Sequence, residues 1–452
     1  MDILITLDMT NKALSANVKL KNERTKMKTN KILAILLGLS LACIVALLAK
    51  FVGQNEPNTA SSQSEQNLSK YRALYARPVS EWDKPKLDES VVKEWREFEP
   101  FKEPLFPANN AYSDIKAFLG LRLFNDPRLS KSGQISCQNC HNQELAFTDG
   151  LKLSYGHDRQ RGRRNAPNIQ MAAFFDELFW DGRAKSLEEQ ALGPITDPKE
   201  MANTLENAQN AIKNATEYYP LFVAAFGDES EQGLWKKHFP QLFEQNATKR
   251  LRSFLRDEIK IDKNFIAKFP SQELETARGL ININNIAKAI ATYERSFVVP
   301  KNSRFNAFLN GDYRFMSDKE LWGLDIFRNK GECMNCHYGA MLSDNKYHNI
   351  GLSFYGRKLQ DLGRYEVTKN PADVGKFKTP SLVSVSRTAP YMHGGIFPHL
   401  IGVINMYNAG FPVAVEKGTE NDPLLPKTDP LIKKLNLTRD EILALEAFLK
   451  SL

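Results

Sequence analysis

The chain has 452 residues, of which 42% are hydrophobic and 25% charged, a composition typical of a soluble globular protein long enough for two domains. Its formal net charge is +8. Much of the excess lies in the first 31 residues, where no aromatic residue accompanies the lysines and arginines, so the charge does not indicate nucleic-acid binding. Four of the five cysteines fall into two C-x-x-C pairs, which leaves Cys43 alone and no pair for a structural disulfide.

Residues 32–52 are the first predicted element. Their sequence, ILAILLGLSLACIVALLAKFV, is close to the run of about 20 apolar residues that a membrane-spanning helix needs. Because the basic segment 1–31 precedes it, the positive-inside rule leaves the N-terminus in the cytoplasm and exports the remainder. A cleaved signal peptide is the alternative. We expect a single uncleaved anchor in the bacterial inner membrane with the folded domains in the periplasm, and the start codon is Met1 or Met27.

Residues 53–90 follow as a predicted tether. The stretch from Gln54 to Asn67 is polar, contains Pro57 and several serines, and has no periodic apolar residues. Such a composition is typical of a linker. We therefore expect folded sequence to begin near Val91.

A five-residue motif occurs twice, as Cys137-Gln138-Asn139-Cys140-His141 and as Cys333-Met334-Asn335-Cys336-His337. A C-x-x-C-H run attaches c-type haem: the cysteines bond to the porphyrin and the histidine binds its iron. A zinc site or a redox-active cysteine pair would need further ligands or a βαβ context, and neither is visible. The sequence thus predicts two covalent haems, with thioethers at Cys137, Cys140, Cys333 and Cys336 and iron ligands at His141 and His337.

Each motif lies within a repeated helical unit. A predicted helix precedes each motif. Ser113 caps the first helix, whose apolar face is formed by Ile115, Phe118, Leu119 and Leu123. A capping box of Ser317 and Glu320 begins the second helix, whose apolar face is formed by Leu321, Leu324 and Phe327. Closing helices follow, one through Ile286, Ile290, Tyr293 and Phe297 and one through Ile442, Leu445, Leu449 and Leu452. The predicted fold is mainly α: two cytochrome c-like helical haem domains in tandem, at 91–300 (with extra helices at 227–279) and 301–452, preceded by the single transmembrane anchor.

Further motifs resemble the bacterial di-haem cytochrome c peroxidases and their MauG-type relatives. They are Arg164-Asn165-Ala166-Pro167, Phe179-Trp180-Asp181-Gly182-Arg183, Gln190-Ala191-Leu192-Gly193-Pro194, Glu200-Met201 and Thr388 to Gly395. The similarity runs from about Ser113 to the C-terminus in the family's order. It implies that the N-terminal haem is the peroxidatic site and that the C-terminal haem takes in or shares electrons.

The resemblance assigns three residues around the first haem. Glu200 matches the acid/base that moves a proton between the two peroxide oxygens, Gln190 its amide neighbour, and Trp180 the tryptophan between the haems. Each has a structural alternative. Asp197 to Glu200 also fits a helix N-terminus with Glu200 in a capping box, Gln190 could belong to an exposed helix face, and Trp180 could be a core aromatic.

The resemblance also suggests two further iron ligands. His157 falls where resting peroxidases keep a loop histidine on the first iron, whereas MauG-type enzymes lack this gate; the alternative is an exposed loop residue. For the second iron the matched position is Tyr407, as in MauG-type enzymes, where classical peroxidases have Met. Met406 is adjacent but lies about 100° away around the helix from the stripe that contains Tyr407. Tyr407 could also be a core aromatic.

One calcium ion is implied as well. Asn165, Thr388 and Pro390 match the family's site between the domains, and oxygen ligands suit calcium. Asn165, before Ala-Pro, is also an ordinary turn residue.

The sequence therefore predicts an oxidoreductase that reduces hydrogen peroxide with electrons from a small redox protein, a cytochrome c or cupredoxin. The alternative is a MauG-like enzyme that oxidises side chains of a partner protein through a shared high-valent iron state. A third hypothesis is a non-catalytic electron-transfer cytochrome. The physiological donor and the oligomeric state, a homodimer included, are left open.

Overall fold

A computed structural model describes residues 68–243, 261–297, 303–413 and 415–452, and residues 68–452 form one compact unit. Among these described residues no helix is both long enough and apolar enough to cross a membrane. The predicted basic segment 1–31, the predicted anchor 32–52 and the first part of the predicted tether lie outside the described residues.

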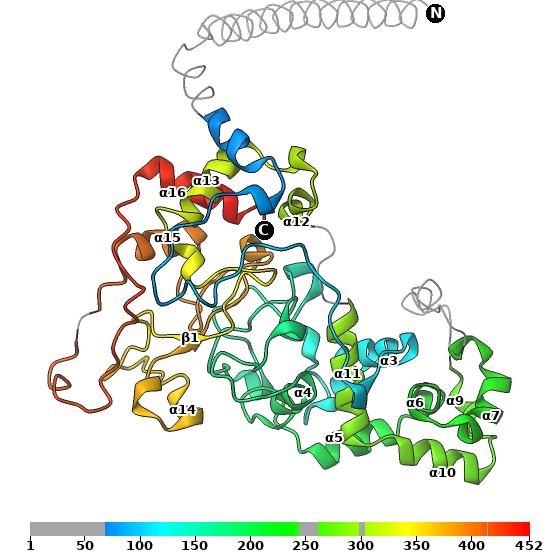
Figure 1. Ribbon diagram of the computed structural model, residues 1–452. Coiled ribbons are helices and arrows are strands. Elements are labelled where there is room, and N and C mark those ends of the chain that lie inside the picture. The colour runs from blue at the N-terminus through cyan, green and yellow to red at the C-terminus, as the bar shows by residue number, and fades with distance from the viewer. Residues whose placement is uncertain (1–67, 244–260, 298–302, 414) are drawn as a thin grey trace, which may run out of the picture. The chain divides into compact units, whose positions relative to one another are not determined.

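The first helical unit is built on α3 (Asp114–Phe124) and α11 (Ile283–Phe297), which pack against each other (Figure 1). Ser113 caps α3 by accepting a hydrogen bond from the Lys116 N–H. A Cβ atom at Gly120 would lie 1.9 Å from the Ala289 carbonyl oxygen, so only glycine allows this close crossing of the two helices. Helices α4 (Leu187–Thr196) and α5 (Leu205–Lys213) complete the unit against α11.

The second helical unit repeats this arrangement with α13 (Asp318–Arg328) and α16 (Arg439–Leu449). Gly323 plays the part of Gly120, because its Cβ would lie 2.0 Å from the Ala444 carbonyl oxygen. Both helices begin with a complete capping box, formed by Ser317 and Glu320 in α13 and by Thr438 and Glu441 in α16. Helices α12 (Arg304–Leu309) and α15 (Leu400–Asn408) belong to the same unit. The mainly helical fold is as predicted.

Short elements and added helices surround the two units. Strands β1 (Tyr347–His348) and β2 (Phe377–Lys378) pair antiparallel near α14 (Tyr365–Thr368). The predicted extra helices include α7 (Glu229–His238), α9 (Lys263–Ile266) and α10 (Ser271–Leu280), which follow α6 (Tyr219–Phe226). They enclose stacked aromatic rings, with the Trp235 and Phe269 centroids 4.4 Å apart, so this segment has a small apolar core of its own.

The predicted tether needs a correction over residues 68–90. This stretch begins with a helix over residues 68–75, and Tyr75, Trp82 and Phe98 are buried in the core of the second unit. The Tyr75 hydroxyl donates to Asp325 at 2.8 Å, and Arg328 donates to the Asp83 carbonyl at 2.6 Å. The predicted domain boundary at residue 91 moves for the same reason, because Phe98 belongs with the second unit and not with the first.

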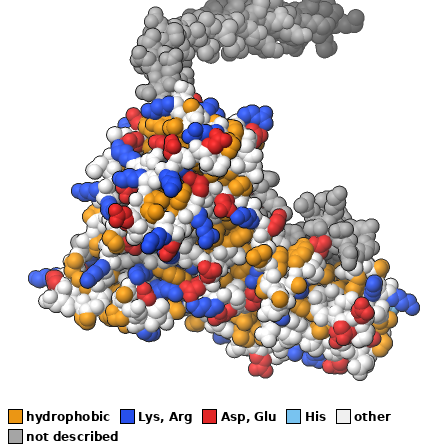
Figure 2. Space-filling view, viewed as in Figure 1, with side chains coloured by type: hydrophobic (Ala, Val, Ile, Leu, Met, Phe, Trp, Pro, Cys, Tyr) orange, Lys and Arg blue, Asp and Glu red, His pale blue; other side chains and the backbone are white. Residues whose placement is uncertain are grey.

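The described surface carries charges of both signs. On the face shown in Figure 2, basic and acidic side chains are interspersed among single apolar ones. No one sign of charge gathers over this described face.

Candidate haem-binding site

The first C-x-x-C-H motif is a tight turn that brings its cysteines and histidine together. A 3₁₀ turn begins at Cys137 and is followed directly by Cys140. Ser136 and Asn139 form a capping box at this turn. The His141 N–H donates to the Cys137 carbonyl at 2.9 Å. The His141 ring Nδ1 lies 3.1 Å from the Phe147 carbonyl, which fixes the tautomer and leaves Nε2 to bind iron. Burial lowers the pKa of His141 and so favours the neutral imidazole that a metal needs.

The second motif repeats this geometry. The His337 N–H donates to the Cys333 carbonyl at 2.9 Å, and the His337 Nδ1 lies 2.8 Å from the Leu342 carbonyl. Burial lowers the pKa of His337 too. None of the four motif cysteines is in a disulfide bond. Each motif thus offers two thiols and one oriented, neutral imidazole, the set that a covalent c-type haem requires.

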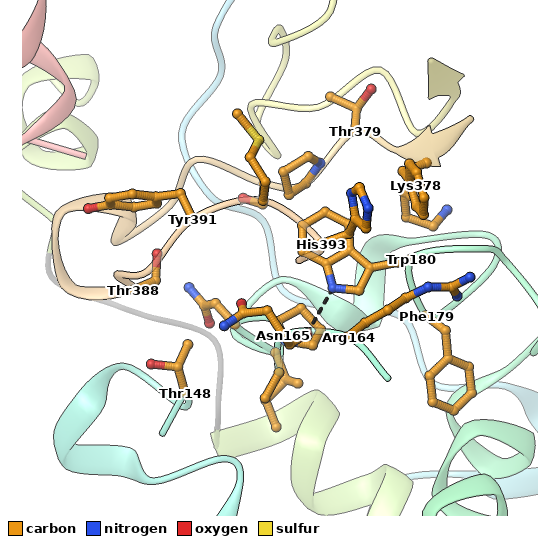
Figure 3. Close-up of a pocket in the computed structure, with 18 of the residues that line it drawn as sticks. Thr148, Arg164, Asn165, Phe179, Trp180, Lys378, Thr379, Thr388, Tyr391 and His393 are labelled. Atoms are coloured by element: carbon orange, nitrogen blue, oxygen red, sulfur yellow. Dashed lines mark hydrogen bonds between the residues drawn. The ribbon is translucent and has the colours of Figure 1, made fainter. Parts of the chain in front are cut away.

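Both motifs open into one cavity of about 710 Å³, within the usual size range of ligand pockets. Figure 3 shows part of its wall, where Trp180 and Asn165 meet the loop that carries Thr388, Tyr391 and His393. The predicted site residues that line this cavity are Cys137, Cys140, His141, Asn165, Trp180, Gln190, Glu200, Cys333, Cys336, His337, Thr388, Pro390 and Tyr407. The structure therefore gathers all the predicted site residues except His157.

Glu200 and Gln190 come from adjacent parts of the first unit. Ser186 caps α4 and so fixes the helix that carries Gln190. Glu200 lies in the turn after α4, where its N–H donates to the Asp197 carbonyl at 3.1 Å. No helix begins at this turn, so the alternative interpretation of Glu200 as a helix-capping residue is wrong.

The pKa of the Glu200 carboxyl is raised, which favours its neutral, protonated form. Burial raises its pKa to about 7, with a further increase from Asp197 and an opposing effect from Arg183. A carboxyl with a pKa near the working pH can both accept and return a proton. Its position on the cavity wall gives it the geometry for that role.

Trp180 joins the two units. Its indole Nε1 donates to the Asn165 carbonyl at 2.9 Å, the dashed line in Figure 3. Its own carbonyl accepts from the Lys378 N–H at 2.8 Å, and its ring lies 6.4 Å from that of His393. Gly182, with a φ of +73°, makes the turn that follows. Trp180 is thus bonded to the first unit through its indole and to the second unit through its backbone carbonyl.

His157 does not reach the cavity. Its Nε2 lies 3.4 Å from the Asp158 carboxylate, and its backbone N–H donates to the Glu200 carbonyl at 2.7 Å. Its buried Nδ1 has no hydrogen-bond partner among the described residues. His157 therefore contacts Asp158 of its own loop and is not among the residues that line the cavity.

Tyr407 lies on α15 and faces the cavity together with Leu400, Val403 and Ile404. Met406, on the same helix, is absent from the cavity wall. The helical stripe inferred from the sequence therefore favours the tyrosine. Burial raises the pKa of the phenol, so the phenolate needs a cation such as a ferric iron beside it.

The predicted calcium ligands lie where the units meet. The Asn165 N–H donates to the His393 carbonyl at 2.7 Å, and its side-chain amide donates to the Leu151 carbonyl at 2.9 Å. The Thr388 hydroxyl bonds to the Val385 carbonyl at 3.1 Å. Asn165 thus ties the units together through hydrogen bonds of its own.

Sequence reasoning missed two buried ionic clusters beside the cavity. Arg164 bonds to Asp181 at 2.5 Å and to Asp361 at 2.7 Å, which links the two units. His348 lies between two carboxylates, 2.7 Å from Asp344 and 2.6 Å from Asp429. No local sequence pattern predicts these pairs, because Asp361 is far along the chain from Arg164 and Asp429 is far from His348.

The His348 cluster forms two ion pairs. Cys336, Asp344 and His348 lie close enough together to hold an ion, and Cys336 is also the cysteine that the C-x-x-C-H motif predicts to be bonded to the porphyrin. Burial opposes the charge on His348, yet its carboxylate partners raise the pKa to about 12.

Comparisons with known proteins agree with this geometry. Residues 114–260 match the family of di-haem cytochrome c peroxidases. The cytochrome c551 peroxidase of Nitrosomonas europaea is 36% identical over 280 residues, which cover 62% of this chain and 68% of that protein. The methylamine utilization protein MauG of Methylophilus methylotrophus is 32% identical over 320 residues, 69% of this chain and 78% of that one. A crystal structure of a MauG-like protein associated with microbial copper homeostasis aligns with a TM-score of 0.56 at 28% identity, covering 79% of this chain and 94% of that chain.

Proposed function

The chain belongs to the family of di-haem cytochrome c peroxidases, and on this premise we propose that it reduces hydrogen peroxide with electrons from a small redox protein. The observation that carries the proposal is the shared cavity. Two complete haem-attachment motifs open into it, and Glu200 and Gln190 lie on the wall beside the first motif. A simple electron-carrying cytochrome would have no use for a carboxyl with a pKa near 7 at that position.

Cys137 and Cys140 would hold the first haem with His141 on its iron, and Cys333 and Cys336 would hold the second with His337. When bound, the haems supply two redox-active irons, the first with a coordination position for peroxide. The overall reaction joins H₂O₂ with two electrons and two protons and yields two water molecules.

The task of the protein is to direct protons. Glu200, as carboxylate, would accept a proton from one peroxide oxygen and return it to the other, which would leave as water. The Gln190 amide orients the far oxygen by hydrogen bonding.

Trp180 is the proposed electron relay between the haems. Its indole donates to the Asn165 carbonyl of the first unit, and its backbone carbonyl accepts from the Lys378 N–H of the second. Such double anchoring restricts its motion and so preserves the orbital contacts that electron transfer needs. Tyr407 is the proposed second ligand of the iron that His337 holds.

A MauG-like activity is the second candidate, and Tyr407 favours it. A phenolate ligand stabilises oxidised iron, whereas a methionine thioether stabilises ferrous iron. The phenol faces the cavity and Met406 does not. With this ligand, Tyr407 would favour an oxidised second iron, and the electrons for the reaction would come from side chains of a docked protein.

The remaining assignments concern the surroundings of the enzyme. We propose one calcium ion held by Asn165, Thr388 and Pro390, an anchor at residues 32–52, and a periplasmic location in a bacterium. The oxygen chemistry of the three residues supports the first. The apolar run supports the second, and the haem motifs fit the third because c-type haem is loaded outside the bacterial cytoplasm.

Replacement of Glu200 tests the peroxidase activity. Steady-state turnover of peroxide with reduced cytochrome c should fall by roughly 10²–10⁴ in kcat/KM in Glu200→Gln, the usual contribution of an acid/base group. The control is Glu206→Gln, which changes an exposed glutamate on α5 and should leave kcat/KM unchanged. Equal rates in wild type and Glu200→Gln would contradict the assigned role.

A further inference from the structure

The N-terminal segment 68–98 brings oxidisable rings onto the second unit. It lies outside the matched family range, which begins at residue 114. Tryptophan and tyrosine are the side chains whose rings lose one electron most readily. Of the chain's five tryptophans, three lie in this segment or on α13: Trp82, Trp95 and Trp322. Figure 1 shows the segment, in blue, beside α13 and α12. Redox-capable side chains thus cover the unit to which the family resemblance assigns electron entry.

Four of these rings form a chain from the surface inward. Tyr71 and Tyr75 are four residues apart on one helix and therefore share a face of it. The Tyr71 ring stacks on that of Trp322 with centroids 6.2 Å apart, and both side chains are partly exposed. The Tyr75 and Trp82 centroids lie 5.1 Å apart, and both side chains are buried. A surface pair, Tyr71 with Trp322, thus leads to a buried pair, Tyr75 with Trp82.

The buried pair meets α13 at its last turn, just before the second haem motif. The Arg328 guanidinium lies over the Trp82 ring at 5.0 Å. The Gly331 N–H donates to the Ile326 carbonyl of the same turn at 2.7 Å, and the Gly331 carbonyl lies 3.3 Å from the sulfur of Cys333. This sulfur is one of the two that the motif predicts to be bonded to the second porphyrin. Gly331 therefore connects that sulfur to the turn that Trp82 contacts.

The polar ends of the two buried rings have different partners. The Tyr75 hydroxyl donates to the Asp325 carboxylate at 2.8 Å, so a proton acceptor is in place when the phenol loses an electron. The Trp82 indole N–H donates to the Tyr75 and Arg77 carbonyls at 3.2 and 3.1 Å, which are not bases. The Arg328 cation also disfavours a second positive charge on the Trp82 ring. Oxidation of Trp82 is therefore transient, whereas Tyr75 can hold an unpaired electron as a neutral radical.

The first unit has a similar phenol without such a chain. The Tyr218 hydroxyl donates to the Asp126 carboxylate at 2.7 Å, and the Arg122 guanidinium lies 5.5 Å over its ring. The rings that follow are those of Phe222, 6.2 Å away, and then Phe226, a further 6.0 Å away. Phenylalanine is much harder to oxidise than tyrosine, so these rings do not extend the path. Of the two phenol–carboxylate pairs, only that of the second unit continues into tyrosine and tryptophan rings among the described residues.

We propose that Trp82 and Tyr75 relay electrons, one at a time, from the surface pair Tyr71–Trp322 to the second haem after hydrogen peroxide has oxidised the enzyme. Tyr75 gives one electron through Trp82 to the second haem, which is reduced by that electron, and the phenolic proton moves to Asp325. One electron from an external donor then reaches Tyr75 through the surface pair. The proton returns from Asp325, and the O–H bond forms again. The net result is the transfer of one electron from the donor to the second haem with the relay unchanged, and two such transfers supply the two electrons that peroxide reduction consumes.

The test is rapid-freeze electron spin resonance of the holoenzyme mixed with hydrogen peroxide and no donor. The wild type should show a neutral tyrosyl radical. Tyr75→Phe should lose this signal because the phenol is absent, and Asp325→Asn should lose it because no base accepts the proton. Trp82→Phe should slow its appearance. The matched control is Tyr218→Phe, which removes the phenol of the first unit and should keep the whole signal.

The surface end of the relay is tested by a second mixing step with ferrocyanide, a small one-electron donor. The wild-type radical should decay after this step, and the decay should be slower in Trp322→Phe. Equal decay in the two proteins, or a wild-type radical that ferrocyanide does not reduce, overturns the assignment of the surface pair.

Two results overturn the relay itself. One is a tyrosyl signal that persists unchanged in Tyr75→Phe. The other is a wild type that forms no tyrosyl radical although its haem absorption bands respond to peroxide. If Tyr75→Phe binds fewer than two haems, Asp325→Asn decides in its place, because this substitution keeps the size of the side chain.

The proposal rests on the peroxide reactivity given under the proposed function, but the two fail separately. If peroxide changes the haem bands and no Tyr75-dependent radical forms, only the relay is overturned. If peroxide leaves the haem bands unchanged, the peroxidase activity is overturned, and flash-quench oxidation with ruthenium tris-bipyridine tests the relay without peroxide. A radical that Tyr75→Phe loses then supports the relay, and any other result overturns it.

Discussion

The pKa of Glu200 makes a quantitative prediction about the pH profile of kcat/KM. Burial moves this pKa from its ordinary value of 4.5 to about 7, a change that corresponds to about 3 kcal/mol against ionisation. Because the carboxylate is the form that accepts the peroxide proton, activity requires the ionised side chain. The ionised fraction rises from about a tenth at pH 6 to about nine tenths at pH 8, so kcat/KM should rise almost tenfold over this range.

The neighbours of Glu200 should move this rise in opposite directions. Asp197 raises the pKa and Arg183 lowers it, so Asp197→Asn should shift the midpoint to lower pH and Arg183→Gln to higher pH. The assay is the initial rate at low peroxide concentration with saturating reduced cytochrome c, since kcat/KM reports the free enzyme. A flat profile between pH 6 and 8, or one that Glu200→Gln leaves intact, would refute the reasoning.

Two further predictions concern other residues. His348→Asn breaks the ion pairs with Asp344 and Asp429 and should lower the free energy of unfolding by about 3 kcal/mol at pH 6 in urea titrations. Because the pKa of His348 is raised, this loss of stability should be full below about pH 6.5 and should shrink as the pH rises toward 12. An equal loss at pH 6 and pH 11 would contradict the prediction. Tyr407→Met should raise the midpoint potential of the second haem, since a thioether favours ferrous iron, whereas Met406→Leu should leave it unchanged; equal potentials in wild type and Tyr407→Met would mean that the phenolate is not bound.

Local signals in the sequence predicted most of the haem-bearing framework. The capping box at Ser317 is present, and both C-x-x-C-H runs form the compact turns that their function needs. These features depend on residues within a few positions of one another, which the sequence displays directly. The stripe that favoured Tyr407 over Met406 is local in the same sense, because one helix carries both residues.

Features that depend on distant contacts could not be predicted. Tyr75, Trp82 and Phe98 are spaced irregularly in a polar stretch, so their burial in the second unit leaves no periodic signal. The pairing of Arg164 with Asp361 depends on the meeting of the two units.

Glu200 and Glu294 show a different limit. The sequence around Glu200 also fits the start of a helix, and Glu294 belongs to an amphipathic helix, α11. The local pattern around each residue therefore fits an ordinary structural role. The family resemblance singles out Glu200, whereas only the cavity distinguishes Glu294 from a surface glutamate.

The coordination of the two irons in the resting ferric enzyme tests the central claim most directly. Low-temperature electron spin resonance, recorded before and after addition of cyanide, reports the ligands of each iron. We expect two haems per chain, of which only the first, on His141, changes its signal with cyanide, while the second retains the signature of His337 and Tyr407. Fewer than two haems, or two irons that both refuse cyanide in every redox state, would contradict the account.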